Sequence, residues 1–85
     1  MRVLELYTHE GCFSRDNALE MLREILPSCP DISFNVVDML KCPDKARALG
    51  IKISPTLVMD GKIISVGLPD ENGLRAMLRA KLMKR

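Results

Sequence analysis

The sequence predicts an α/β fold with the element order βαβαββα, in which helices flank a mixed four-stranded sheet. Three observations predict it. The hydrophobic pattern switches between strand and helix periods in that order, and an Asp-Gly pair joins two β-prone segments late in the chain. The 85 residues have room for one domain, expected to span residues 1–85, and 47% of them are hydrophobic, with few aromatics. Aliphatic side chains are therefore expected to fill the core.

The first half of the chain is expected to form a strand, a helix and a second strand. Residues 2–8 are short, apolar and β-prone, and residues 32–37 repeat that pattern. Residues 13–26 change to the helical period, and Pro27 ends the run. The apolar face of this helix consists of Ala18, Leu19, Leu22, Ile25 and Leu26.

The second half contains two further helices. Pro43 is suited to the first position of a short helix, and Gly50 is suited to its C-terminal cap. Asp70 can cap a last helix at its N-terminus. The apolar face of that last helix is predicted to carry Leu74, Met77, Leu78 and Leu82.

A β-hairpin is the strongest local prediction in the chain. Residues 56–59 and 62–66 are β-prone, and Asp60-Gly61 between them favours a tight two-residue turn. The first two strands are joined through a helix and should be parallel, while the hairpin should extend the same sheet in antiparallel fashion.

The charge pattern and the start of the chain exclude several classes of function. The net charge is only +2, from thirteen basic and eleven acidic residues that are interspersed, so a nucleic-acid partner is not expected. The first apolar run is short and interrupted by Glu5, which predicts no signal peptide, membrane segment or membrane partner. Three irregularly spaced cysteines indicate free thiols in a reducing compartment, and we expect a cytoplasmic protein.

Two motifs define a candidate site. Cys12 follows the first strand and precedes the first helix, and Ile53-Ser54-Pro55-Thr56 opens a later strand about forty residues away. Together they resemble the active-site edge of the thioredoxin and glutaredoxin superfamily, in which a cysteine at a helix N-terminus faces a cis-proline loop. Further matches run in the family's order over nearly the whole chain: Asp38, Pro43, Gly50-Ile51, Asp60-Gly61 and Val66-Gly67.

The resemblance implies roles for several residues. It implies that Pro55 is cis and that the backbone of Ser54 pairs with an extended substrate. It further implies that Phe13 and Gly67 border the same substrate site, with Gly67 providing a positive φ or a close backbone approach.

One departure from the family limits the chemistry. Arg15 stands where the second cysteine of the family's motif is expected, because residues 11–15 read Gly-Cys-Phe-Ser-Arg rather than Trp-Cys-Gly-Pro-Cys or Cys-Pro-Tyr-Cys. A dithiol cycle within the motif is therefore impossible. The Gly-Gly that follows the hairpin in glutaredoxins is missing, so no glutathione, iron–sulfur or other cofactor is expected, and the scattered cysteines predict no metal site.

Cys12 has two interpretations. At a helix N-terminus, free N–H groups and the helix dipole favour its thiolate, and Arg15 could add a positive charge. The alternative is a small structural residue in a tight turn.

The other two cysteines are candidates for a resolving thiol. Cys29 is expected about 20 Å away, beyond the far end of the first helix, too far for a disulfide. Cys42 is expected one strand over, on the order of 10 Å from Cys12. It is a candidate resolving or regulatory thiol, the alternative being an ordinary residue near the start of the second helix.

Three functions remain open on the sequence. The first is a monothiol disulfide oxidoreductase in which Cys12 forms a mixed disulfide with a protein thiol or disulfide partner and an external thiol releases it. The second is a redox-inactive binding module that keeps the groove beside Pro55. The third rests on Ser14-Arg15 and residues 19–23, which resemble the start of glutaredoxin-linked arsenate reductases. A monomer or a weak dimer is expected in each case.

Overall fold

The computed structural model describes residues 2–83, with side chains described to residue 80, so the predicted position of the Leu82 side chain lies outside the described residues. The elements follow the predicted order. They are β1 (Arg2–Thr8), α1 (Arg15–Ile25), the 3₁₀ helix η1 (Leu26–Ser28), β2 (Ile32–Asp38), α2 (Pro43–Leu49), β3 (Thr56–Met59), β4 (Lys62–Val66) and α3 (Glu71–Met83).

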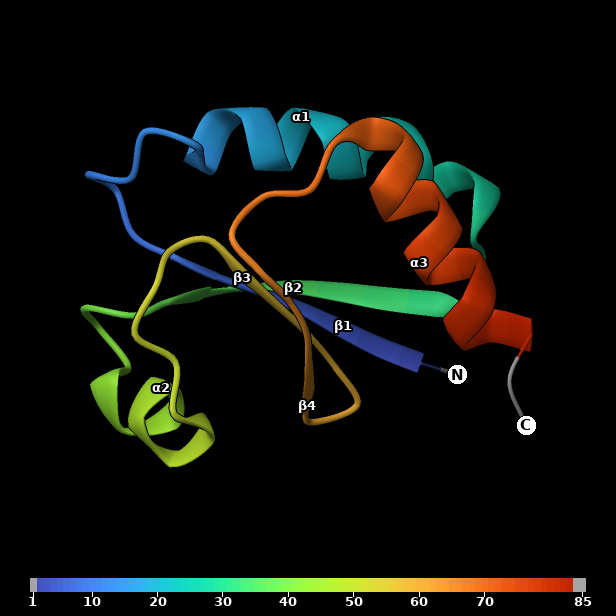
Figure 1. The fold of residues 1–85 in the computed structure, drawn as a ribbon. Coiled ribbons are helices and arrows are strands. Elements are labelled where there is room, and N and C mark those ends of the chain that lie inside the picture. The colour runs from blue at the N-terminus through green and yellow to red at the C-terminus, as the bar shows by residue number, and fades with distance from the viewer. Residues whose placement is uncertain (1, 84–85) are drawn as a thin grey trace.

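The four strands form one sheet in the order β2-β1-β3-β4. β1 and β2 pair in parallel, with Leu6 opposite Val36, whereas β3 pairs antiparallel with both β1 and β4. The mixed sheet and its strand directions are therefore confirmed (Figure 1). β1 lies between β2 and β3, which brings its C-terminal end next to the chain segment that enters β3.

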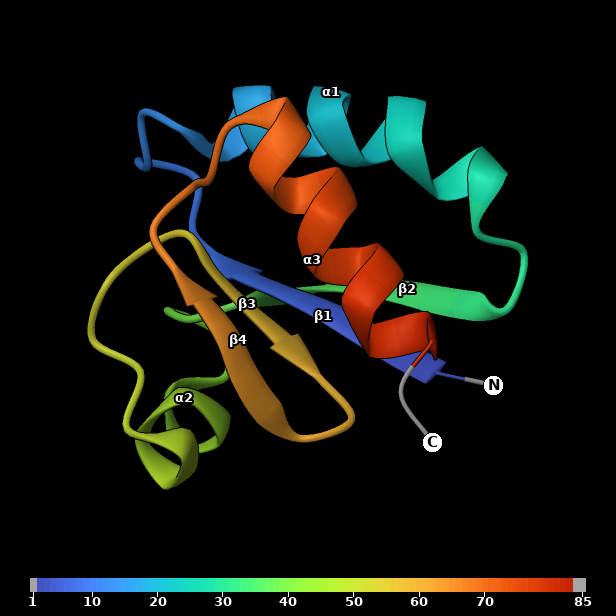
Figure 2. The same ribbon diagram turned by 45° about the vertical axis from the view of Figure 1, so that its right-hand side comes forward.

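The helices cover the two faces of the sheet unequally. α1 and α3 lie on one face and α2 lies on the other (Figures 1 and 2). Strand alternation explains which β1 side chains meet which helices, because successive residues point to opposite faces. Leu4 and Leu6 therefore belong to the cluster beneath α1 and α3, and Tyr7 belongs to the cluster beneath α2.

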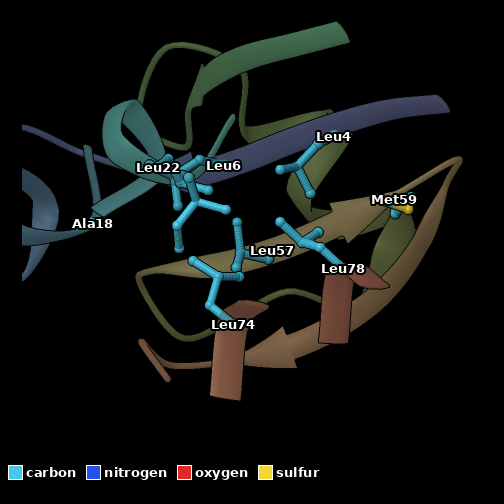
Figure 3. Packing of buried hydrophobic residues seen from close by; sticks show 9 residues of the cluster. Leu4, Leu6, Ala18, Leu22, Leu57, Met59, Leu74 and Leu78 are labelled. Carbon is cyan, nitrogen blue, oxygen red and sulfur yellow. The ribbon is translucent and has the colours of Figure 1, made fainter. Parts of the chain in front are cut away.

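The larger core cluster holds α1 and α3 against the sheet. Figure 3 shows side chains from β1, β3, α1 and α3 converging in one aliphatic layer. The buried members of this cluster are Leu4, Leu6, Ala18, Leu22, Ile25, Leu57, Met59, Leu74 and Leu78. The predicted apolar face of the first helix is thus confirmed, with Leu19 and Leu26 partly buried at its border.

The predicted bounds of the first helix, residues 13–26, were wrong at both ends. The N–H of Arg15 donates to the carbonyl of Cys12 at 3.3 Å, so the chain first makes a tight turn, and α1 begins only at Arg15. At the other end Leu26 and Pro27 continue into η1 instead of ending all helical structure. Periodicity detects the buried face of a helix but does not register these short i→i+3 turns.

The predicted caps of the other helices are confirmed. Gly50 ends α2 in a left-handed conformation with φ of 74°, where a side chain would be strained. Asp70 caps α3, since its Oδ1 accepts the N–H of Gly73 at 2.6 Å. Within the described part of the chain, no helix has the length and apolar character needed to cross a membrane.

Asp60 ties the hairpin turn to the start of the central strand. Its carboxylate accepts the N–H of Val3 at 2.9 Å and a guanidinium N–H of Arg2 at 3.0 Å. The Asp60 N–H in turn donates to the Val3 carbonyl at 2.9 Å. The Val3 N–H first, and then the Arg2 guanidinium, hold the pKa of the Asp60 carboxyl below its ordinary value.

This anchor predicts a pH-dependent stability difference between the wild type and Asp60→Asn. Because the pKa is depressed in the folded state, the contribution of Asp60 is fully present above the unfolded pKa of about 4 and is lost as the pH falls through the folded pKa. Asn tolerates the positive φ of 51° at this position. We expect the wild type to be more stable at pH 7, with the difference narrowing as urea unfolding is repeated below about pH 4. A stability difference between the two proteins that stays constant with pH would contradict the stabilising role of the ionised Asp60 carboxylate.

Candidate functional site

The loop between β1 and α1 places Cys12 above the C-terminal end of the central strand. The N–H of Cys12 donates to the carbonyl of His9 at 3.1 Å, and the carbonyl of Cys12 accepts the N–H of Arg15. These two turns reverse the chain from strand into helix and leave the Cys12 side chain partly buried. The loop leaves the sheet at the same end as the segment that enters β3 (Figure 2).

Burial and four hydrogen-bond donors set the pKa of the Cys12 thiol. Burial raises the pKa of the Cys12 thiol, but hydrogen bonds from the Ser54 hydroxyl, the Ser14 N–H, the Thr8 hydroxyl and the Arg15 N–H outweigh this effect and lower the pKa overall. A thiolate accepts these hydrogen bonds better than a neutral thiol does, which is the physical origin of the shift. The site therefore favours the nucleophilic form of the cysteine.

Thr8 and Ser54 belong to one hydroxyl network. The Ser54 hydroxyl donates to Thr8 Oγ1 at 3.1 Å, and Thr8 is 1% exposed. A hydroxyl carries one proton and two lone pairs, so Ser54 can direct its proton either to Thr8 or to the Cys12 sulfur. The pair can thus reorient toward the sulfur when the thiol loses its proton.

The segment before β3 forms the opposite wall of the site. The Ser54–Pro55 peptide bond is cis, and Pro55 is buried. The Thr56 hydroxyl donates to the carbonyl of Ile53 and fixes the bend at this point. The backbone of Ser54 is thereby held beside Thr8 at the end of β1.

Gly67 connects the end of β4 to the same wall. Its N–H donates to the carbonyl of Pro55 at 2.8 Å, and its φ is 85°. A Cβ at this position would meet no atom within 4 Å. Glycine is therefore required here for the left-handed backbone conformation rather than for close packing.

Exposed apolar side chains adjoin three segments of the site. Phe13 is fully exposed next to Cys12, Ile53 is exposed next to Ser54, and Val66 is exposed next to Gly67. Each of these apolar residues is a chain neighbour of Cys12, Ser54 or Gly67, so accessible apolar surface adjoins three segments of the site. Single exposed apolar residues are ordinary, whereas a group around a nucleophile indicates a docking surface.

Arg15 acts on the sulfur through its backbone. Its N–H is one of the four donors to Cys12, while its guanidinium lies 3.7 Å from the Asp16 carboxylate. The Arg15 side chain is about one-third exposed and Asp16 is almost fully exposed, so this ion pair is weak.

The other two cysteines lie apart from this network. Cys42 is exposed at the N-cap of α2, which covers the sheet face opposite to α1. It lies on the same side of the sheet as Tyr7, which belongs to the cluster beneath α2. Cys29 follows η1 and packs against the larger core cluster. All three cysteines are free thiols in the structure.

Thr8 is the site residue that sequence reasoning missed. One signal for it existed, because strand alternation places Thr8 on the same face as Leu4 and Leu6, at the end of the strand that leads to Cys12. Its polar side chain at a buried position required a partner, and Ser54 provides it. Among residues 2–80, no group of His, Cys, Asp or Glu side chains is arranged to hold a metal ion.

Removing the Ser54 hydroxyl should weaken the nucleophile. Ser54→Ala deletes the strongest of the hydrogen bonds that lower the pKa of Cys12, so the pKa should rise and the thiolate fraction at pH 7 should fall. We expect the iodoacetamide alkylation rate of Cys12 at pH 7 to drop severalfold. Ser28→Ala, at the exposed end of η1, is the matched control and should keep the wild-type rate. Equal rates in both variants would contradict the role of Ser54.

Comparisons with known proteins bear on the fold of the chain. No family model matches the chain. The thioredoxin of Methanocaldococcus jannaschii is 26% identical over 80 residues, which cover 93% of this chain and 94% of that protein. The desulfothioredoxin of Desulfovibrio vulgaris Hildenborough, solved in its reduced form, superposes with a TM-score of 0.81 at 23% identity, covering 93% of this chain and 80% of that one.

The chain has a thioredoxin-like fold. A mutant of the thioredoxin from Halobacterium salinarum NRC-1 gives a TM-score of 0.78 at 25% identity, covering 93% of the thioredoxin-like chain and 73% of that protein. The predicted fold class is confirmed by these similarities together with the observed sheet.

Proposed function

We propose that this thioredoxin-like chain is a small thiol–disulfide redox protein that acts through Cys12 alone. The observation that carries the proposal is the set of four donors around the Cys12 sulfur, two from hydroxyls and two from backbone N–H groups. Thiolates are the reactive form in disulfide exchange, and this environment favours the thiolate. Similarity to the thioredoxin of Methanocaldococcus jannaschii over nearly the whole chain also supports a thiol–disulfide redox function.

The reaction proceeds by two kinds of exchange. The Cys12 thiolate attacks one sulfur of a partner's disulfide, forming a bond to it, and the other partner sulfur leaves as a thiolate that takes a proton from water. An external thiolate then attacks the Cys12 sulfur and releases the first partner sulfur as a thiolate. A second external thiol attacks that new mixed disulfide and regenerates Cys12. The partner disulfide is reduced to two thiols while two external thiols are oxidised to one disulfide.

The partner is a protein that docks on the apolar border of the site. Phe13, Ile53 and Val66 present exposed apolar surface next to Cys12, Ser54 and Gly67 in the chain, which suits a polypeptide partner better than a small charged molecule. The Ser54 backbone beside the sulfur lies where an extended partner segment could pair with it.

An external thiol, rather than Cys42, completes the cycle in this proposal. Arg15 stands three residues after Cys12, so the motif holds no second thiol. The position of Cys42 at the N-cap of α2, on the opposite face of the sheet from α1, supports the external route. Because the cycle consumes free thiols, we assign it to a reducing compartment, the cytoplasm.

A redox-inactive binding module is the second candidate function. The same apolar border would serve it, and the arginine at position 15 is the specific observation that favours it. In this function Cys12 is a structural residue of the groove, and the partner binds without forming a covalent bond.

Trapping of a mixed disulfide tests the proposal. The reduced wild type and the Cys42→Ser variant are mixed with a peptide that holds one internal disulfide, quenched in acid and mapped by mass spectrometry. We expect a peptide adduct on Cys12 in both proteins, at equal rates. An adduct mainly on Cys29 or Cys42, or its loss in Cys42→Ser, would overturn the proposal.

A further inference from the structure

An open groove of about 540 Å³ lies beside the Cys12 site, between the loop that follows β2, helix α2 and the segment that leads toward β3. His9 forms part of its wall, and His9 also accepts the backbone hydrogen bond of Cys12. The groove therefore borders the site, yet none of the four donors to the Cys12 sulfur lines it. Figure 2 shows α2 and the segment after it on the side of the sheet away from α1 and α3.

The lining combines aliphatic side chains with cations. Met39, Leu40 and Ile51 provide apolar surface, and Arg47 and Lys52 provide positive charge. Leu40 is 74% exposed, so its aliphatic side chain is accessible to a ligand in the groove. Among the described residues that line the groove, none is acidic.

Positive charge exceeds negative charge in the segment that lines the groove. Residues 39–52 contain one acidic residue, Asp44, against four cations, which gives +3, whereas the whole chain carries only +2. The cations are Lys41, Lys45, Arg47 and Lys52. Residues 75–85 are more basic still, with five cations and no acidic residue, so the groove lies in one of two basic segments of the chain.

The cations of the groove are available to a ligand. Arg47 has only the highly exposed Asp44 as partner, at 3.5 Å, and such a surface pair is worth little. Lys52 is exposed and makes no ion pair with any described residue. The nearby carboxylate of Asp38 is turned to the backbone, because its Oδ1 accepts the N–H groups of Leu40 and Lys41.

We propose that this groove binds an extended segment of a partner protein in which an aliphatic side chain lies next to a glutamate or an aspartate. The aliphatic side chain packs on Leu40 and Ile51, and the carboxylate binds between Arg47 and Lys52. Two cations without an acidic neighbour in the lining select against basic segments and favour acidic ones. The binding does not use the Cys12 thiol, so it stands or falls independently of the redox chemistry.

Fluorescence anisotropy with a defined probe tests the inference. The probe is a labelled peptide that alternates leucine with glutamate, and its matched control carries glutamine in place of glutamate. We expect the wild type to bind the glutamate peptide at least about tenfold more tightly at low salt, with the preference shrinking as salt is added. Equal affinity for the two peptides would overturn the inference. Equal binding of a labelled single-stranded oligonucleotide would also overturn it, since the region would then be a general anion surface.

Charge-reversal variants test whether the glutamate peptide binds in the groove. Arg47→Glu combined with Lys52→Glu should weaken binding of the glutamate peptide about tenfold or more, whereas Lys62→Glu combined with Arg79→Glu, two exposed positions outside the lining, should leave it unchanged. Leu40→Ala should weaken binding without unfolding the protein, and Cys12→Ser should retain it. Equal losses in both charge-reversed proteins would place the interaction outside the groove and contradict the inference.

Discussion

Cys12→Ser is expected to abolish disulfide exchange while the fold is retained. A serine oxygen cannot form a disulfide, and its hydroxyl does not ionise at neutral pH, so neither the attack nor the mixed disulfide remains. The change is close to isosteric at a partly buried position, so the four donors around it should stay in place. The measurement is the reduction of a peptide disulfide by an external thiol, with catalytic amounts of each protein.

Cys42→Ser is the matched control for this experiment, since it also removes one thiol. We expect the control to reduce the peptide at the wild-type rate and Cys12→Ser to give only the rate of the external thiol alone. Residual catalysis by Cys12→Ser would rule out the monothiol mechanism. A wild type without catalysis, together with undiminished partner capture by Cys12→Ser, would establish the binding module instead.

Leu6→Ala is expected to cause the largest loss of stability. Leu6 is 0% exposed at the centre of β1 and packs in the cluster beneath α1 and α3 (Figure 3). Truncating a buried leucine to alanine leaves a cavity and lowers the free energy of unfolding by about 2–5 kcal/mol. That loss is a large share of the roughly 5–15 kcal/mol that stabilises an ordinary native protein. Urea unfolding followed by circular dichroism measures the change.

Leu40→Ala is the matched control, because it removes the same atoms from a side chain that is 74% exposed, and it should alter the free energy of unfolding by less than about 0.5 kcal/mol. If Leu6→Ala does not fold, Ile25→Val in the same cluster provides a milder test, with an expected loss of about 0.5–1.5 kcal/mol. Equal effects of the two leucine changes would contradict the assigned core.

The hairpin shows what local sequence determines. A tight turn of this kind needs positive φ at both central residues, and the structure has φ of 51° at Asp60 and 82° at Gly61. Because the Asp-Gly pair satisfies that requirement by itself, the strands on both sides were predicted with their observed bounds. Likewise, Gly50 and Asp70 act within a few residues of their own position and could be assigned as caps.

The start of α1 and the role of Thr8 show where the sequence is insufficient. The turn from Cys12 to Arg15 depends on a single i→i+3 hydrogen bond that leaves no mark in the hydrophobic pattern. Thr8 acquires its function only through Ser54, which lies 46 residues further along the chain. The groove beside α2 also depends on the fold, because α2 and the loops on both sides of it bring the apolar and cationic residues together.

The pH dependence of Cys12 alkylation tests the central claim most directly. The native protein is treated with iodoacetamide over a range of pH, and the modification of each cysteine is followed by peptide mapping, with a short unstructured cysteine peptide as reference. We predict that Cys12 titrates at lower pH than the reference peptide, because the hydrogen bonds to its sulfur lower its pKa despite partial burial. A Cys12 that titrates with the reference peptide or above it would contradict a thiolate nucleophile, and with it the proposed redox function.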